Sequence, residues 1–110
     1  MSLATDLSTF KDAVEGKLPK EAFRVISESI ETFVQTWNPA KAVNVGQPFP
    51  DFSLSDATGK RVSLKELLAK GPLLISFYRG EWCPYCNMAV KALQGSLSDI
   101  KARGVTLVAR

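Results

Sequence analysis

The 110-residue sequence contains no histidine and only two cysteines. A zinc site would therefore need carboxylate ligands or a second chain, because zinc in proteins is bound mainly by cysteine and histidine. No apolar run approaches the length of a membrane span, and the first residues lack the basic and apolar blocks of a signal peptide. The 14 lysines and arginines are interspersed with 11 aspartates and glutamates, and a net charge of +3 without a basic run gives no reason to expect nucleic-acid binding.

An apolar content of 45% is normal for a globular core, and the length allows one domain at most. Two cysteines in a chain without a signal peptide fit a reducing compartment, where closely spaced pairs are catalytic or redox-sensing. We therefore expect a cytoplasmic protein without a cofactor or metal, and without nucleic-acid or membrane partners.

Both cysteines lie in one short motif, Cys83-Pro84-Tyr85-Cys86. The motif follows an apolar run at 73–78, which predicts a buried strand, and precedes a run that predicts a helix to about residue 103. The apolar positions at helical spacing are Val90, Leu93, Leu97 and Ile100. Such a pair between a strand and a helix is typical of a dithiol redox site. The alternatives are weaker, because a structural disulfide here would close a very short loop and half a zinc site would lack its other ligands.

The start of a helix favours a thiolate for a physical reason. Backbone N–H groups of the first turn have no partner within the helix, and the helix dipole is positive there, so Cys83 near the N-cap becomes a better nucleophile. Pro84 suits the first helical position. Cys86 lies about one turn further and can resolve a mixed disulfide formed at Cys83. Arg79 adds positive potential and Glu81 opposes it, and the sequence leaves open which is nearer the sulfur.

Two helices are predicted before the redox motif. The first has apolar residues at 7, 10 and 14, with Thr5 or Asp6 as its cap, and the second begins at Pro19 and ends at Asn38-Pro39. The apolar face of the second helix consists of Phe23, Ile26, Ile30, Phe33 or Val34, and Trp37. We expect this stripe to be core packing, against the rest of the chain or against a second subunit in a homodimer. Residues 1–45 would thus form a helical arm and linker, and 46–110 a redox domain.

The redox domain is predicted to open with a hairpin, in which strands at 51–55 and 61–64 flank a turn at 56–59. Ser63 and Glu66 form a capping-box pattern for a short helix, which Gly71-Pro72 ends. Gly104 suits the C-terminal cap of the redox helix, and the run at 105–109 predicts a second strand parallel to 73–78. The fold class is therefore α/β, a hairpin plus a βαβ unit preceded by two helices. Two parallel strands leave an open edge, so we expect the sheet to be incomplete at the C-terminus, as in a truncated chain.

Two segments carry a family resemblance. VGQPFPDFSLSDATGKRVSL at 45–64 resembles the entry hairpin of the peroxiredoxins, the alkyl hydroperoxide reductase/thiol-specific antioxidant (AhpC/TSA) family. FYRGEWCPYC at 77–86 is similar to the active-site segment of that family, especially of a branch with Cys-Pro-Tyr-Cys. The resemblance covers nearly the whole chain, and implies a thioredoxin-like fold and an antioxidant enzyme that reduces hydroperoxides with thiols.

The resemblance leaves the roles of the two cysteines open. Aligned on Phe77-Tyr78, Cys86 takes the position of the peroxidatic cysteine of the family. Cys83 then replaces the threonine that orients the peroxide, acting as a local resolving cysteine, and Arg79 replaces a typical proline. Aligned on the thioredoxin and glutaredoxin pattern instead, Cys83 attacks and Cys86 resolves. The family also uses an arginine from a later strand, and the thioredoxin fold a cis-proline; no proline follows Pro84, so we expect this chain to lack parts of that site.

Three functions follow from these patterns. The first is a peroxiredoxin-like thiol peroxidase that reduces hydroperoxides through the Cys83–Cys86 dithiol/disulfide couple, with the sulfenic acid on Cys86. Its reductant would be thioredoxin, glutaredoxin or glutathione. The second is a thioredoxin- or glutaredoxin-like thiol–disulfide oxidoreductase in which Cys83 attacks. The third is a catalytically incomplete fragment that acts in dimerisation or partner binding.

Overall fold

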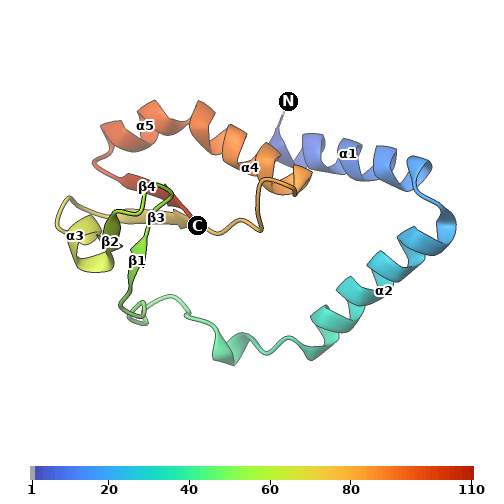
Figure 1. The fold of residues 1–110 in the computed structure, drawn as a ribbon, viewed down its shortest axis with the longest axis horizontal. Coiled ribbons are helices and arrows are strands. Elements are labelled where there is room, and N and C mark those ends of the chain that lie inside the picture. The colour runs from blue at the N-terminus through green and yellow to red at the C-terminus, as the bar shows by residue number, and fades with distance from the viewer. Residues whose placement is uncertain (1) are drawn as a thin grey trace. The chain divides into compact units, whose positions relative to one another are not determined.

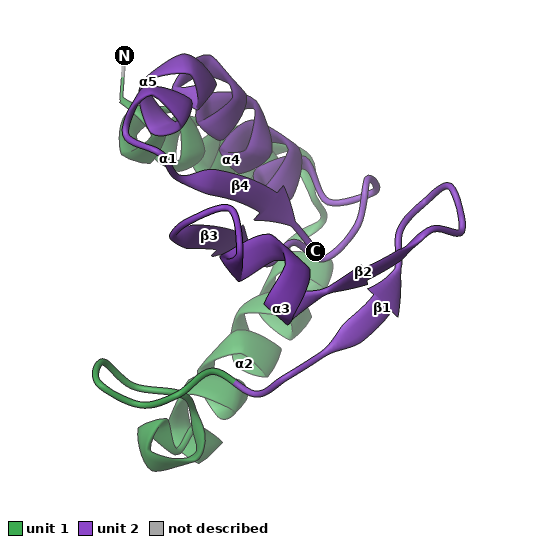
Figure 2. Ribbon diagram, turned by 90° about the vertical axis from the view of Figure 1, so that its left-hand side faces the viewer, with its two compact units in different colours: residues 1–49 green, residues 50–110 purple. Residues whose placement is uncertain are grey.

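The computed structural model describes residues 2–110 (Figure 1). The chain divides into two compact units, the first ending at Phe49 and the second spanning Pro50–Arg110 (Figure 2). Each unit is described by itself. Within the described residues, no helix is long and apolar enough to cross a membrane.

The first unit contains helices α1 (Leu3–Lys17) and α2 (Lys20–Thr36) and the 3₁₀ helix η1 (Pro39–Lys41). Ser2 caps α1, since its hydroxyl accepts a hydrogen bond from the N–H of Thr5 at 3.2 Å. The prediction of Thr5 or Asp6 as the cap is therefore wrong. The helix begins earlier because the Ser2 backbone is extended, which is the N-cap conformation that a serine side chain satisfies.

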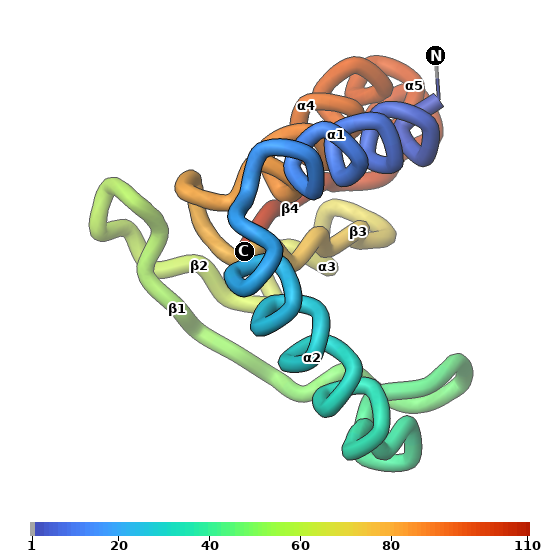
Figure 3. The backbone as a smooth tube through the Cα atoms, turned by 90° about the vertical axis from the view of Figure 1, so that its right-hand side faces the viewer, coloured from blue at the N-terminus to red at the C-terminus, as the bar shows by residue number. Residues whose placement is uncertain are grey.

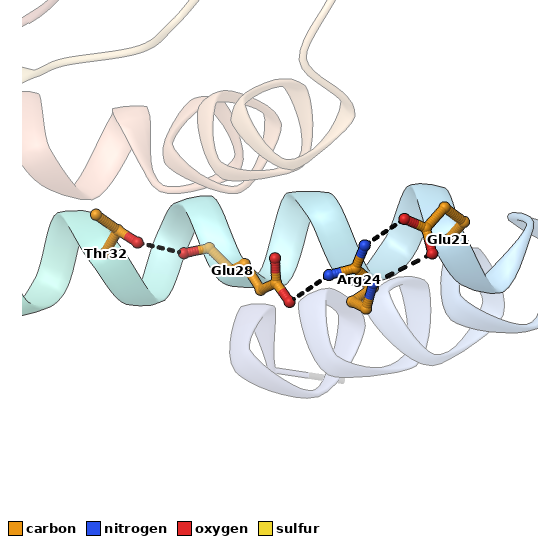
Figure 4. Close-up of polar contacts among 4 residues, drawn as sticks. All are labelled: Glu21, Arg24, Glu28 and Thr32. Carbon is orange, nitrogen blue, oxygen red and sulfur yellow. Dashed lines mark hydrogen bonds and ion pairs between the residues drawn. The ribbon is translucent and has the colours of Figure 1, made fainter.

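Helix α2 has a polar face joined by ion pairs (Figure 4). The Arg24 guanidinium binds the carboxylates of Glu21 and Glu28, with 2.6 Å between Nη1 and Glu28 Oε1. Pro19 is the N-cap rather than the first helical residue, and α2 ends at Thr36, close to the predicted end. The next turn is capped by Asn38, whose Oδ1 accepts from the N–H of Ala40 at 3.0 Å.

The predicted apolar face of α2 is not buried. Ile30 is 58% exposed, and both Phe33 and Val34 are 64% exposed. The ring centroids of Phe33 and Trp37 lie 6.0 Å apart. The packing expected for this stripe is therefore not made within the first unit, because a single amphipathic helix cannot cover its own apolar face.

The second unit opens with the predicted hairpin, in which β1 (Ser53–Ser55) pairs antiparallel with β2 (Arg61–Ser63) (Figure 3). Asp56 organises the turn. Its Oδ1 accepts from the N–H groups of Thr58 at 2.8 Å and Lys60 at 3.0 Å, and from the Thr58 hydroxyl at 2.6 Å. Gly59 has a φ of +85°, which glycine adopts without steric cost.

Helix α3 (Leu64–Leu68) follows β2 directly. Its predicted cap is confirmed, since the Ser63 hydroxyl accepts from the N–H of Glu66 at 3.1 Å. The N–H of Leu64 donates to the carbonyl of Phe52 at 3.0 Å and joins the helix to the hairpin. Leu64 is one of two nearly inaccessible residues in the described chain, and Cys83 is the other.

Strands β3 (Leu73–Ser76) and β4 (Thr106–Ala109) form the second small sheet, and their predicted parallel pairing is confirmed. The register pairs Leu73 with Thr106 and Ser76 with Ala109. The prediction that the first of these strands is buried is wrong, because its side chains are half-buried or exposed. Two strands cannot enclose their side chains as the inner strands of a wider parallel sheet do.

The predicted redox helix is two helices, α4 (Pro84–Gly95) and α5 (Leu97–Ala102). The break falls at Ser96, with φ −101° and ψ 5°, next to a glycine that is a weak helix former. The predicted cap at Gly104 is confirmed, and this glycine has a φ of +74°. The N–H of Gly104 donates to the carbonyl of Lys101, and the N–H of Val105 donates to the carbonyl of Ile100. These two bonds form a Schellman motif.

Gly71 provides a test of the close packing at the start of the β3–β4 pair. A Cβ at this position would lie 2.8 Å from the carbonyl oxygen of Gly104, and φ is +125°. We expect Gly71→Ala to reduce the free energy of unfolding by about 1–3 kcal/mol, because both the backbone strain and the contact with backbone are unfavourable. Gly95→Ala is the matched control, since a Cβ there meets nothing within 4 Å, and it should change stability by less than about 1 kcal/mol, in the stabilising direction. Urea unfolding measures the stability of both variants. Equal changes in the free energy of unfolding would contradict the close approach of Gly71 to the Gly104 carbonyl.

Asp56 gives a prediction about pH. The Thr58 hydroxyl holds the pKa of this carboxyl below its usual value, with smaller contributions from the N–H groups of Thr58 and Lys60 and the Lys60 charge, partly opposed by burial. Since the folded pKa is lower than the unfolded pKa, the stabilisation is present above the unfolded value and is lost as the pH falls through the folded value. We expect Asp56→Ala to lower the melting temperature at neutral pH and to have little effect in acid. A difference that persists unchanged in acid would contradict this role.

Candidate redox site

The two cysteines begin α4. Cys83 is the N-cap residue, with extended φ −93° and ψ 107°, and Pro84 takes the first helical position as predicted. The N–H of Cys83 donates to the carbonyl of Gly80 at 3.0 Å. From the next turn, Asn87 donates to the carbonyl of Cys83 through its backbone at 3.0 Å, and to that of Glu81 through its side-chain amide at 2.7 Å. These bonds fix the loop to the helix and determine where the sulfurs lie.

The two thiols differ in accessibility, and both are reduced. Cys83 is 3% exposed, whereas Cys86 is half-buried. The sulfur of Cys86 accepts a hydrogen bond from the backbone N–H of Arg79 at 3.3 Å. Cys86 is therefore held from the loop side, and Cys83 is enclosed at the start of the helix.

The pKa of the Cys83 thiol lies below its ordinary value. Hydrogen bonding from the Cys86 thiol is the largest cause, followed by the backbone N–H of Cys86; burial opposes them, and the Arg79 charge and the Tyr85 N–H assist. The Cys83 side chain does not complete a capping hydrogen bond with the first turn. The positive end of the helix dipole at this N-terminus adds to these effects. The arrangement favours a thiolate on Cys83.

The loop before Cys83 holds a further arrangement that the sequence analysis missed. The Arg79 guanidinium carbon lies 5.0 Å from the ring centroid of Trp82, within the range of a cation–π contact. Gly80 permits this arrangement, because its φ is +152° and an added Cβ would lie 2.8 Å from Trp82 Cδ1. The signal available in the sequence was the order Arg-Gly-x-Trp directly before the first cysteine. Of the two charged residues that the sequence analysis weighed, Arg79 is among the causes that lower the pKa of Cys83.

An open groove runs along α4 near the carboxyl ends of the two parallel strands, with a volume of about 480 Å³. Its lining residues are Tyr78, Glu81, Asn87, Val90, Lys91, Gln94 and Ala109. Ligands of open α/β sheets bind at the carboxyl ends of strands, so the groove lies on the side of the sheet where substrates of such folds approach.

A dithiol at the start of a helix that follows a parallel strand is typical of thioredoxin-like thiol-redox proteins. The model of the AhpC/TSA family matches residues 45–109, and the chain belongs to this family. The match includes the hairpin, both parallel strands and the two cysteines, and it confirms the resemblance and the thioredoxin-like fold class that it implies.

Individual relatives are similar over about 60% of the chain. Thiol-disulfide oxidoreductase ResA of Bacillus subtilis is 32% identical over 69 residues, which are 63% of this chain and 37% of that protein. Chloroplastic peroxiredoxin Q of Populus jackii is 35% identical over 60% of this chain and 30% of its own length. The putative peroxiredoxin bcp of Helicobacter pylori is 32% identical over 60% of this chain and 43% of its own length. The matched segment thus spans less than half of each of these relatives, and no solved structure matches the chain.

The role of the Cys86 thiol as a donor can be tested with two variants. Removing the donor in Cys86→Ala should raise the pKa of Cys83 and slow its alkylation by iodoacetamide at neutral pH, about tenfold for each pKa unit. Cys86→Ser retains an O–H donor, so we expect a smaller change. Alkylation rates of Cys83 across a pH series measure the effect in both variants, in which Cys83 is the single thiol. Identical pH midpoints in the Ala and Ser variants would contradict the donor role.

Proposed function

We propose that this chain belongs to an enzyme that reduces hydroperoxides, with Cys83 as the attacking thiolate and Cys86 as the resolving thiol. The observation that carries the proposal is the combination of a lowered pKa and near-complete burial at Cys83. A buried thiolate can be reached by a small peroxide more easily than by a protein disulfide. The similarity to peroxiredoxin Q and bcp supports the same reaction.

The reaction balances with the groups at hand and an external reductant. The Cys83 thiolate attacks one peroxide oxygen, an S–O bond forms and the O–O bond breaks, and the alkoxide takes a proton to leave as an alcohol. The Cys83 sulfenic acid then reacts with Cys86, whose sulfur displaces the hydroxyl group as water and forms the Cys83–Cys86 disulfide. Two external thiol groups then reduce this disulfide: the first forms a mixed disulfide with one cysteine, and the second attacks that mixed disulfide, releases both cysteines as thiols and leaves the reductant oxidised to a disulfide.

The reductant that we propose is a thiol of the thioredoxin, glutaredoxin or glutathione class, acting in the cytoplasm. A reducing thiol must attack one sulfur of the disulfide, and the sulfur attacked depends on access. Cys86 is the more exposed cysteine in the reduced state, so we place the entry of the reductant there. This assignment exchanges the cysteine roles that the family alignment implies, in which the sulfenic acid forms on Cys86.

Reduction of a protein disulfide is the second candidate function. The specific observation in its favour is the similarity to ResA, which carries the name thiol-disulfide oxidoreductase. The Cys83 thiolate would attack one sulfur of the substrate disulfide and expel the other as a thiolate. Cys86 would then attack Cys83, release the second substrate thiol and leave an intramolecular disulfide. Burial of Cys83 would require the loop at 79–82 to open before a protein disulfide could reach it.

Two serine variants test the proposed roles. We expect Cys83→Ser to abolish peroxide consumption, because the attacking thiolate is lost. Cys86→Ser should still form a sulfenic acid at Cys83, which dimedone traps, but should turn over only with a small external thiol. Peroxide-dependent NADPH oxidation in a coupled thiol system measures turnover, and mass spectrometry of the dimedone adduct locates the sulfenic acid.

The opposite pattern, with an adduct on Cys86 that persists in Cys83→Ser, would place the peroxidatic role where the family alignment has it. Reduction of insulin disulfides without any peroxide consumption would favour the second candidate function.

A further inference from the structure

The loop from Arg79 to Trp82 is built around one side chain. Arg79 makes two separate interactions: its backbone N–H donates to the sulfur of Cys86 at 3.3 Å, and its guanidinium stacks on the ring of Trp82 at 5.0 Å. The Trp82 ring lies against Gly80, where no Cβ stands in its way. The contact with Trp82 limits the freedom of a long side chain that would otherwise sample many rotamers, and the backbone contact holds the residue beside Cys86.

We propose that Arg79 is a positioning residue of the dithiol, with Trp82 as the surface that holds its guanidinium where it stabilises negative charge on Cys83. The inference rests on the proposed role of Cys83 as the attacking thiolate. Arg79 would act on both sulfurs, through its amide on Cys86 and through its side-chain charge on Cys83.

Charge and geometry support this assignment over a purely structural contact. The charged groups on the surrounding elements are Glu81 in the same loop, Lys91 on α4 and Arg110 at the end of β4, where its backbone pairs with Tyr78. Arg79 is placed at the dithiol by its own backbone, whose N–H donates to the Cys86 sulfur at 3.3 Å, and its charge is among the causes that lower the pKa of Cys83. The neighbouring thiol of Cys86 and the backbone dipoles supply the rest of the stabilisation.

Trp82 has the position expected of a holding surface. Trp82 is 67% exposed and therefore adds little to a core. The Arg79 guanidinium stacks on one face of its ring. An exposed aromatic ring of this kind lowers the entropy cost of placing a cation near the site, because it favours the stacked rotamers of the arginine.

The test measures the pH dependence of Cys83 alkylation by iodoacetamide, with the modified peptide quantified by mass spectrometry, in the reduced protein with both cysteines present. We expect Arg79→Met to slow alkylation of Cys83 at neutral pH by about threefold to tenfold and to move the midpoint of the pH profile upward. Arg79→Lys should recover part of the rate, because it retains the charge but stacks less well. Added salt should reduce the difference in rate between the unaltered protein and the Arg79→Met variant.

Arg61→Met is the matched control. It removes the same charge from an exposed residue of β2, in the other sheet of the same unit, and should leave the pH profile unchanged. Trp82→Leu should slow alkylation in the same direction as Arg79→Met, and in the Arg79→Met background it should add little, because Trp82 acts through Arg79. Circular dichroism of each variant confirms that the fold is retained.

The possible outcomes separate this inference from the proposed function. An unchanged midpoint in Arg79→Met, or an equal shift in Arg61→Met, overturns the positioning role. If Arg79→Lys fails to recover any rate while Arg79→Met folds normally, the charge is not the active feature and the inference also falls. If the Arg79 variants behave as expected but the parent protein consumes no peroxide, the positioning role stands and the proposed function fails.

Discussion

The parallel pairing of β3 with β4 is the interaction on which the redox site depends. The ladder continues beyond the strands, since Arg110 donates to the carbonyl of Ser76 at 2.8 Å and Tyr78 donates to that of Arg110 at 2.7 Å. The backbone is thereby held up to the residue before Arg79. The loop must then return to the first turn of α4, and the sulfur of Cys86 meets the Arg79 N–H at the start of this loop. The contact between the Arg79 N–H and the Cys86 sulfur joins residues that are seven positions apart in the sequence. Its geometry is set by the hydrogen bonds between β3 and β4, which are about 30 residues apart.

The electrostatics of the dithiol come mainly from hydrogen bonds over short distances. The pKa of Cys83 is lowered first by the Cys86 thiol and the N–H of Cys86, and only then by the charge of Arg79. This order matters because hydrogen bonds to a thiolate survive salt, whereas the attraction of an exposed guanidinium is screened. The dithiol lies at the start of a helix, within the segment that matches the AhpC/TSA family. The local hydrogen bonds lower the pKa of Cys83, the cysteine that the proposed function makes the attacking thiolate.

Local signals in the sequence predicted the elements whose ends depend on a few neighbouring residues. The cap at Ser63, the Schellman glycine at Gly104 and the parallel strands around the redox helix are all as predicted. The break at Ser96 was not predicted, because the helical spacing of apolar residues continues across it. The cap at Ser2 was not predicted, because other polar residues close to it were equally good candidates. The burial expected for β3 is not found, and the α2 stripe is not covered within its own unit. A hydrophobic pattern shows which face of an element can be buried, and not which other element or chain covers it.

The sequence by itself determined that two thiols lie one helical turn apart at a helix start, because the spacing and Pro84 require only local geometry. Only the tertiary structure decided that Cys83 is enclosed while Cys86 is half-buried, and that Arg79 is among the causes that lower the pKa of Cys83. Both depend on the path of the loop between β3 and α4. That path follows from strand pairing, from the φ of Gly80 and from the contact between Arg79 and Trp82. These are interactions in space whose geometry the order of residues does not specify.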